Sequence, residues 1–91
     1  MPKLQKEIKV LNKLGLHARP AAVLVQTTNR FKSEITIRKD DMEINAKSIM
    51  GIIMLAAECG SVLLVTVSGD DAEDALSIVG ELFLRKFGEK E

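Results

Sequence analysis

The only histidine of the chain, His17, lies in the segment Gly15-Leu16-His17-Ala18-Arg19-Pro20. Pro20 suits the first turn of a helix, because the N–H that proline lacks would have no partner there. We therefore expect His17 at or beside a helix N-terminus, where unpaired N–H groups and the helix dipole attract phosphate. Arg19 adds a cation whose donors match phosphate oxygens. A nucleophilic imidazole at such a place indicates reversible phosphorylation, although a plain helix cap remains the alternative interpretation of His17.

The chemistry of such a histidine sets what else the site needs. An imidazole with the ordinary pKa of about 6.5 is largely neutral near pH 7, so its ring nitrogen can attack phosphorus. Phosphoryl transfer mostly requires positioning and charge balance, and a phosphoryl group that must stay transferable needs a shallow, exposed site. We expect no cofactor. With one His and one Cys in the chain, the softer side chains offer no metal-ligand cluster, so we expect no metal either.

Composition narrows the class of protein. Thirteen basic and thirteen acidic residues give a formal net charge of zero, which argues against a nucleic-acid partner. The chain has neither a signal-like start nor an apolar run of membrane-spanning length, so we expect a cytoplasmic protein without membrane insertion. Its 91 residues suffice for one domain with a modest core, and we assign residues 1–91 to it. The single cysteine, Cys59, is expected to be structural and half-buried.

Hydrophobic periodicity predicts the secondary structure. The expected order is a strand around 8–10, a helix from His17 to Asn29, strands over 34–38 and 42–45 paired as a hairpin, a short helix from Ser48 ending at Gly60, a strand over 62–67 and a helix over 72–83. Four strands with helices on one face form an α+β two-layer sandwich whose other face meets water. We expect Asp70 or Asp71 to cap the last helix and residues 89–91 to fray.

The segment that follows Ser48 is apolar almost throughout, more than a short helix on a two-layer domain can bury. We expect Ile49, Met50 and Ile53 to form an exposed patch that docks partners. Ser48 is a good N-cap. A phosphate on it would place about two negative charges beside the patch and could block docking, although the plain N-cap is the simpler interpretation.

Two separate motifs carry a resemblance to a known family. Gly15-Leu16-His17-Ala18-Arg19-Pro20-Ala21 resembles the active-site signature of HPr, the histidine-containing phosphocarrier of the bacterial sugar phosphotransferase system. Lys47-Ser48-Ile49-Met50-Gly51 resembles the regulatory-serine signature of the same family. Length, element order and the spacing of the motifs agree, so the resemblance covers nearly the whole chain.

The resemblance implies a phosphocarrier rather than an enzyme with its own substrate. His17 would accept phosphate on Nδ1 from phosphorylated enzyme I, with Ala18 and Arg19 binding the phosphoryl group, and would pass it to enzyme IIA domains of sugar permeases. Ser48 would be phosphorylated by an HPr kinase/phosphorylase, and that form would bind a catabolite repressor in some bacteria. The fold would be an open-faced sandwich, βαββαβα, with an antiparallel sheet in the order 1-4-2-3 and three helices on one face. A monomer is expected.

Three alternatives stay open beside the sugar phosphocarrier. Asn12-Lys13-Leu14-Gly15 and Leu82-Phe83 are also similar to the nitrogen-branch paralogue NPr, which shares the histidine chemistry. A regulatory binding module would act through Ser48 and leave His17 idle. A small histidine-dependent hydrolase is disfavoured, since the sequence shows neither an orienting partner for His17 nor a deep cleft.

Overall fold

The structure is a computed structural model that describes residues 2–90. Its elements are β1 (Lys3–Lys9), α1 (Ala18–Thr28), β2 (Glu34–Lys39), β3 (Met42–Asn45), α2 (Ile49–Met54), β4 (Val62–Ser68), α3 (Ala72–Leu84) and the 3-10 turn η1 (Lys86–Gly88). The expected order βαββαβα is confirmed, with η1 as an addition after the last helix. None of the helices within the described chain is long and apolar enough to span a bilayer.

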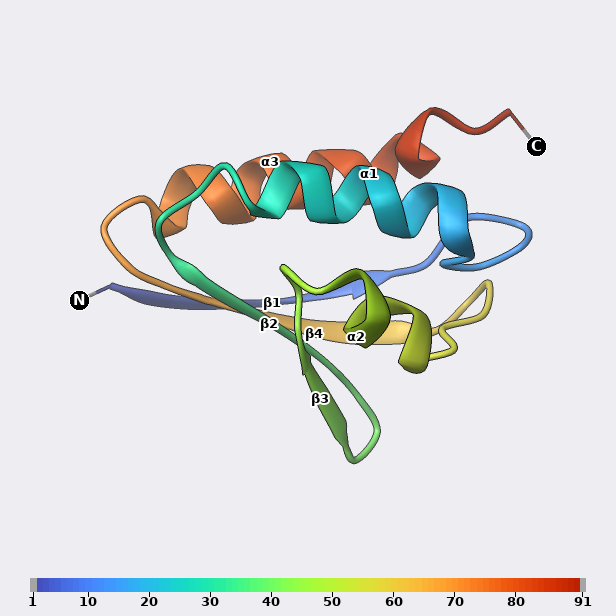
Figure 1. Ribbon diagram of the computed structural model, residues 1–91, viewed down its shortest axis with the longest axis horizontal. Helices are drawn as coiled ribbons and strands as arrows, with labels where there is room; N and C mark the ends of the chain where they lie inside the picture. Colours follow the sequence, from blue (N-terminus) through green and yellow to red (C-terminus); the bar gives the residue numbers. More distant parts are fainter. Residues whose placement is uncertain (1, 91) are drawn as a thin grey trace.

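The four strands form one antiparallel sheet in the order β1-β4-β2-β3. The inner strand β4 buries Leu63, Val65 and Val67, and the side chains between them are less buried, because successive residues of a strand point to opposite faces. Helices α1 and α3 cover one face and leave the other open, as Figure 1 shows. The α+β open-faced sandwich is therefore confirmed, and α2 packs on α1 and β3 at the edge of the helical layer.

The core lies between the sheet and the two long helices. In α3, Ala72, Ala75, Val79 and Phe83 are buried at helical spacing. In α1 the buried positions are Pro20, Ala21, Leu24, Thr27 and Thr28. Thr28 points inward, and its hydroxyl donates a hydrogen bond to the Ala46 carbonyl, 2.8 Å away. That bond ties the end of α1 to the chain before α2.

Two expected boundaries are wrong. The first strand begins at Lys3, well before Ile8, because it pairs along its whole length with β4. The helix expected to run from Ser48 to Gly60 ends at Met54 instead. Ala56 follows with φ +50, a left-handed conformation that stops a helix. Lys39 Nζ lies 3.3 Å from the carbonyl oxygens of both Leu55 and Ala56 and so satisfies the end of α2.

The start of α3 also differs from expectation. Asp71 is the N-cap residue, but its side chain makes no capping hydrogen bond. Its carboxylate instead accepts bonds from the backbone N–H groups of Lys32 and Ser33, at 2.8 and 2.9 Å, and from the Ser33 hydroxyl. These bonds, the Ser33 hydroxyl foremost, lower the pKa of Asp71. Asp71 therefore ties the loop before β2 to the start of α3.

Candidate functional site

His17 stands at the start of α1, as the sequence predicts. The preceding loop is closed by the Gly15 N–H bonding the Asn12 carbonyl at 3.0 Å and the Leu16 N–H bonding the Ala57 carbonyl at 2.9 Å. Leu16 is buried below the ring. His17 is the N-cap residue of α1, in an extended conformation and without a side-chain capping bond. The alternative that His17 serves as a side-chain cap is therefore wrong, and the imidazole is available for other contacts.

The first turn of α1 leaves backbone donors unpaired in the helix. The first intrahelical bond runs from the Ala21 N–H to the His17 carbonyl, 3.0 Å away. Pro20 has no N–H, so Ala18 and Arg19 supply the two N–H groups of this turn that no helical carbonyl can reach. The Arg19 side chain is exposed and makes no hydrogen bond or ion pair with residues 2–90. The chain thus places two backbone N–H groups, and the residue that bears the guanidinium, within one helical turn of His17.

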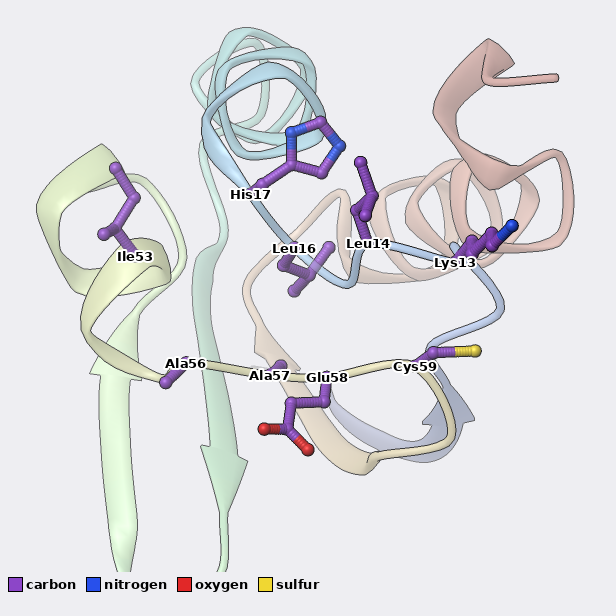
Figure 2. Close-up of a pocket in the computed structure, with 9 residues that line it drawn as sticks. All are labelled: Lys13, Leu14, Leu16, His17, Ile53, Ala56, Ala57, Glu58 and Cys59. Carbon is purple, nitrogen blue, oxygen red and sulfur yellow. The ribbon is translucent and has the colours of Figure 1, made fainter. Parts of the chain in front are cut away.

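An open hollow of about 620 Å³ lies beside His17. Its lining consists of Lys13, Leu14, Leu16, His17, Ile53, Ala56, Ala57, Glu58 and Cys59. Figure 2 shows the imidazole at the head of α1, with Ile53 of α2 on one side, Leu14 on the other, and residues 56–59 along the opposite wall. Cys59 is exposed rather than half-buried. The hollow therefore joins His17 to the apolar side of α2.

The residues expected to dock partners are exposed. Met50 is 63% exposed, and Ile49 and Ile53 are about two-fifths exposed, whereas Ile52 and Leu55 of the same segment are buried. Met54, 60% exposed, also belongs to this surface, and sequence reasoning missed it. We call these four residues, Ile49, Met50, Ile53 and Met54, the α2 patch.

Ser48 caps α2 as expected. Its Oγ accepts a hydrogen bond from the Gly51 N–H, 3.2 Å away. The side chain is half-buried, and the next two residues along the chain are the exposed Ile49 and Met50. Helix α2 packs on α1, so the α2 patch and the His17 site occupy neighbouring elements. A charge added at Ser48 would therefore lie next to the patch.

One member of the site was missed by sequence reasoning. Glu89, expected to fray, lies with its Oε2 2.8 Å from His17 Nε2, and its side chain is only 13% exposed. Asn12 Nδ2 holds the other carboxylate oxygen at 2.6 Å. The expectation that His17 lacks an orienting partner is therefore wrong. Of the other two residues expected to fray, Lys90 is exposed and residue 91 lies outside the described chain.

No group of three or more His, Cys, Asp or Glu side chains within residues 2–90 is arranged to hold a metal ion. The Cys59 sulfur lies 3.8 Å from the Leu11 carbonyl oxygen. Within the same described residues, it belongs to no group of possible metal ligands. The polar groups that the described residues bring together here are the His17 imidazole, the Glu89 carboxylate and the backbone N–H groups of Ala18 and Arg19.

Comparisons with known proteins agree with this geometry. Residues 4–84 match the family model described as "PTS HPr component phosphorylation site". The phosphocarrier protein HPr of Treponema pallidum is 49% identical over 85 residues, which are 93% of this chain and 97% of that protein. The crystal structure of HPr-C-His from Thermoanaerobacter tengcongensis superposes with a TM-score of 0.90 at 45% identity and covers all of both chains.

A further relative has a different name. The HPr-like protein Crh of Bacillus subtilis is 44% identical over 73 residues, which are 80% of this chain and 86% of that protein. A crystal structure of Crh, described as a catabolite repression protein that forms a domain-swapped dimer, superposes with a TM-score of 0.74 at 38% identity. That structure covers 91% of this chain and 95% of its own.

Proposed function

The chain belongs to the HPr family of phosphocarrier proteins of the bacterial phosphotransferase system, and on that premise we propose that His17 is the residue that carries the phosphoryl group. In this proposal Nδ1 accepts it from phosphorylated enzyme I and passes it to the enzyme IIA domains of sugar permeases. The observation that carries the proposal is the position of His17, uncapped and 35% exposed at the start of α1. The ring is accessible to a partner while its backbone is fixed.

The transfer step needs few groups. The lone pair of the neutral ring nitrogen attacks phosphorus, the bond between phosphorus and the donor atom breaks, and its electron pair returns to the donor. The N–H groups of Ala18 and Arg19 and the Arg19 guanidinium then bind the phosphoryl oxygens, because anions bind at helix N-termini. Transfer onward is the same step in reverse toward a different acceptor. No cofactor or metal takes part in this scheme, and the protein is a carrier, not an enzyme.

The α2 patch is the surface on which we expect enzyme I and enzyme IIA domains to dock, because apolar exposure of this kind marks protein interfaces. Ile53 belongs both to the patch and to the hollow beside His17, which supports a contact that covers both. In our proposal Ser48 is the regulatory site, modified by an HPr kinase/phosphorylase. Its phosphate would oppose docking of enzyme I and create a surface for a catabolite repressor.

We propose that residues 1–91 act as a single domain and as a monomer in the cytoplasm, without nucleic-acid or membrane contacts. The zero net charge supports the absence of a nucleic-acid partner. Because Crh forms a domain-swapped dimer, the oligomeric state is tested directly, by light scattering over a range of protein concentrations. A mass equal to one chain supports the proposal, and a concentration-dependent dimer contradicts it.

A second candidate function is favoured by the similarity to Crh, whose structure is described in terms of catabolite repression. In that case the protein would be a regulatory module that acts through Ser48, with His17 idle. The nitrogen-branch carrier NPr is a variant of the first candidate, and it would deliver phosphate to a different enzyme IIA. Supplying IIA domains of both branches to the phosphorylated protein separates the two carriers by transfer rate.

The deciding experiment incubates the protein with enzyme I and phosphoenolpyruvate and maps the labelled residue. We expect an acid-labile label on His17, and His17→Ala should abolish it while keeping the thermal unfolding transition. Label that persists in His17→Ala, or that sits on another residue, contradicts the proposal. If His17→Ala accepts no label yet retains full regulatory activity in cells, the module that acts through Ser48 is favoured instead.

A further inference from the structure

The contact between His17 and Glu89 fixes where the imidazole proton sits. Glu89 Oε2 lies 2.8 Å from His17 Nε2. A carboxylate can only accept hydrogen bonds, so Nε2 must be the donor and carry the proton. In a neutral ring the other nitrogen, Nδ1, then holds the lone pair. Within residues 2–90 no group forms a hydrogen bond with Nδ1. The contact thus leaves the nucleophilic nitrogen open.

Asn12 holds the Glu89 carboxylate in place. Its Nδ2 lies 2.6 Å from Glu89 Oε1 and 2.8 Å from the Lys86 carbonyl oxygen. The amide can have only this orientation, because the reverse would put Oδ1 against two acceptors. Asn12 is fully buried, and its Oδ1 finds no partner within the described chain. A buried polar atom without a partner lowers the stability of the fold. That this asparagine is buried in spite of that cost indicates that its role is to bind Glu89 Oε1 and the Lys86 carbonyl oxygen.

The chain after α3 is bent to deliver Glu89. Lys86 and Phe87 both have φ of +55, and Gly88 has φ of +84, so three successive residues are left-handed. Such conformations are unfavourable for side chains as large as these. Phe87 is buried and packs edge-to-face on Phe83, with ring centroids 4.8 Å apart, and so holds the bend. Figure 1 shows this segment at the end of the molecule where α1 begins.

We propose that Glu89 is a positioning residue for phosphoryl transfer at His17, which holds the proton on Nε2 and so presents the Nδ1 lone pair to the phosphoryl donor. The inference rests on the function proposed above. As the Nδ1–phosphorus bond forms, the ring keeps its Nε2 proton and gains positive charge, and the donor atom recovers the electrons of the broken bond. The carboxylate 2.8 Å away then balances that charge. Asn12 acts one step further out, on Glu89.

The position of the Glu89 carboxylate argues against an inhibitory role in phosphoryl transfer. A carboxylate beside the transferred group would repel the phosphoryl oxygens and slow the reaction. Glu89 instead contacts the nitrogen that does not react in this scheme, and its second oxygen is neutralised in part by the Asn12 amide. The arrangement is that of a partly buried carboxylate that orients a catalytic imidazole and fixes its tautomer.

Two substitutions of Glu89 separate control of the imidazole tautomer from the loss of the carboxylate itself. In Glu89→Gln, Asn12 still donates to the position of Oε1, so the new amide presents its NH₂ group to His17 Nε2. That nitrogen must then accept, and the proton moves to Nδ1, the atom that should attack phosphorus. Glu89→Ala removes the partner without imposing the wrong tautomer. The glutamine variant should therefore be the slower of the two, although it is closer in shape to the native side chain.

The test measures the tautomer and the rate separately. We expect the ¹⁵N spectrum of the imidazole at pH 8.5 to show the Nε2-protonated form in the native protein and the Nδ1-protonated form in Glu89→Gln. Phosphorylation by enzyme I should slow about tenfold in Glu89→Ala and about a hundredfold in Glu89→Gln. Glu81→Gln is the matched control, because within residues 2–90 the Glu81 carboxylate pairs only with the exposed Arg85 on α3. This variant should change neither the tautomer nor the rate.

The outcomes are distinct. An Nδ1-protonated ring in the native protein overturns the inference. This measurement needs no variant, so it tests the inference even if a Glu89 variant fails to fold. A Glu89→Ala protein that is phosphorylated as fast as the native one, or faster, also overturns it. Label on a residue other than His17 would instead refute the proposed function, and the tautomer measurement would still report whether Glu89 controls the ring.

Discussion

Gly15 lies so close to Ala57 that a β-carbon on Gly15 would stand 2.3 Å from the Ala57 carbonyl oxygen. The same oxygen accepts the Leu16 N–H bond at 2.9 Å, so this approach sets the position of the loop that carries His17. We predict that Gly15→Ala lowers both the free energy of unfolding and the rate of His17 phosphorylation. Its φ of +68 adds strain of roughly 1–3 kcal/mol to the clash. Urea denaturation and a phosphorylation time course measure the two effects.

Gly60→Ala is the control for that substitution. Gly60 also has a positive φ, +91, but a β-carbon there would meet no atom within 4 Å. The variant should lose stability through backbone strain alone and keep the native phosphorylation rate. Equal rates for Gly15→Ala and Gly60→Ala would show that the approach to Ala57 has no part in placing His17.

Arg19 should act through its charge on the transferred group. Its side chain makes no contact that holds the fold within residues 2–90, so Arg19→Ala should leave the melting temperature unchanged. We expect kcat/KM for phosphorylation by enzyme I to fall on the order of tenfold or more, because a preplaced donor to the phosphoryl oxygens is lost. Arg30→Ala, an exposed arginine beyond the far end of α1, should have little effect. An unchanged rate in Arg19→Ala would exclude the proposed role.

Ser48 allows its capping and regulatory roles to be separated. Ser48→Ala removes the acceptor of the Gly51 N–H and should cost about 0.5–2 kcal/mol of stability while leaving docking to enzyme I intact. Ser48→Asp keeps a capping oxygen but adds a negative charge beside Ile49 and Met50, so it should remain stable and bind enzyme I more weakly. Thermal melts and isothermal titration with enzyme I distinguish the two. Equal affinity for Ser48→Asp and the native protein would count against regulation by charge at this position.

Asp71 predicts a specific pH dependence of stability. Hydrogen bonds from Ser33 and Lys32 lower its pKa below the ordinary 3.8. A group whose pKa is lower in the folded state stabilises the protein above its unfolded pKa, and that contribution disappears as the pH falls through the folded value. Asp71→Asn should therefore be less stable than the native protein at pH 7, and the difference should shrink once the pH falls below about 4. Denaturant midpoints across this range, with the exposed Asp70→Asn as control, give the measurement.

Periodicity predicted the elements whose burial repeats along the chain. Strand β4 alternates buried and less buried residues, and α3 keeps its apolar face at helical spacing. Each of these elements packs on the core through one face, so its apolar residues repeat regularly in the sequence. The start of α1 was predicted for a different reason, since Pro20 limits the backbone locally. The exposure of Ile49, Met50 and Ile53 followed from a count of apolar residues too large for one buried face. Met54 was missed although it lies four residues after Met50 in α2, and therefore on the same face of the helix.

What the sequence did not predict depends on contacts between distant residues. Helix α2 stops before Gly60 because Ala56 adopts a left-handed conformation that Lys39, from β2, stabilises. Glu89 meets His17 across 72 residues of sequence, after a bend that no local preference favours. One local signal existed: Phe87 followed by Gly88, directly after a helix, indicates a buried anchor and a tight reversal. Together with the polar Asn12 beside the loop, it could have placed the tail near the histidine.

The imidazole of His17 has one nitrogen in contact with Glu89 and one that forms no hydrogen bond within residues 2–90. In the proposed scheme, the donor and the acceptor of the phosphoryl group therefore need the same nitrogen and cannot bind at the same time. Each molecule would have to dissociate from one partner before it binds the next. The overall rate of phosphoryl transfer would then depend on how quickly both complexes dissociate. A large excess of either partner would then inhibit phosphoryl transfer, because it would occupy the site that the other partner needs.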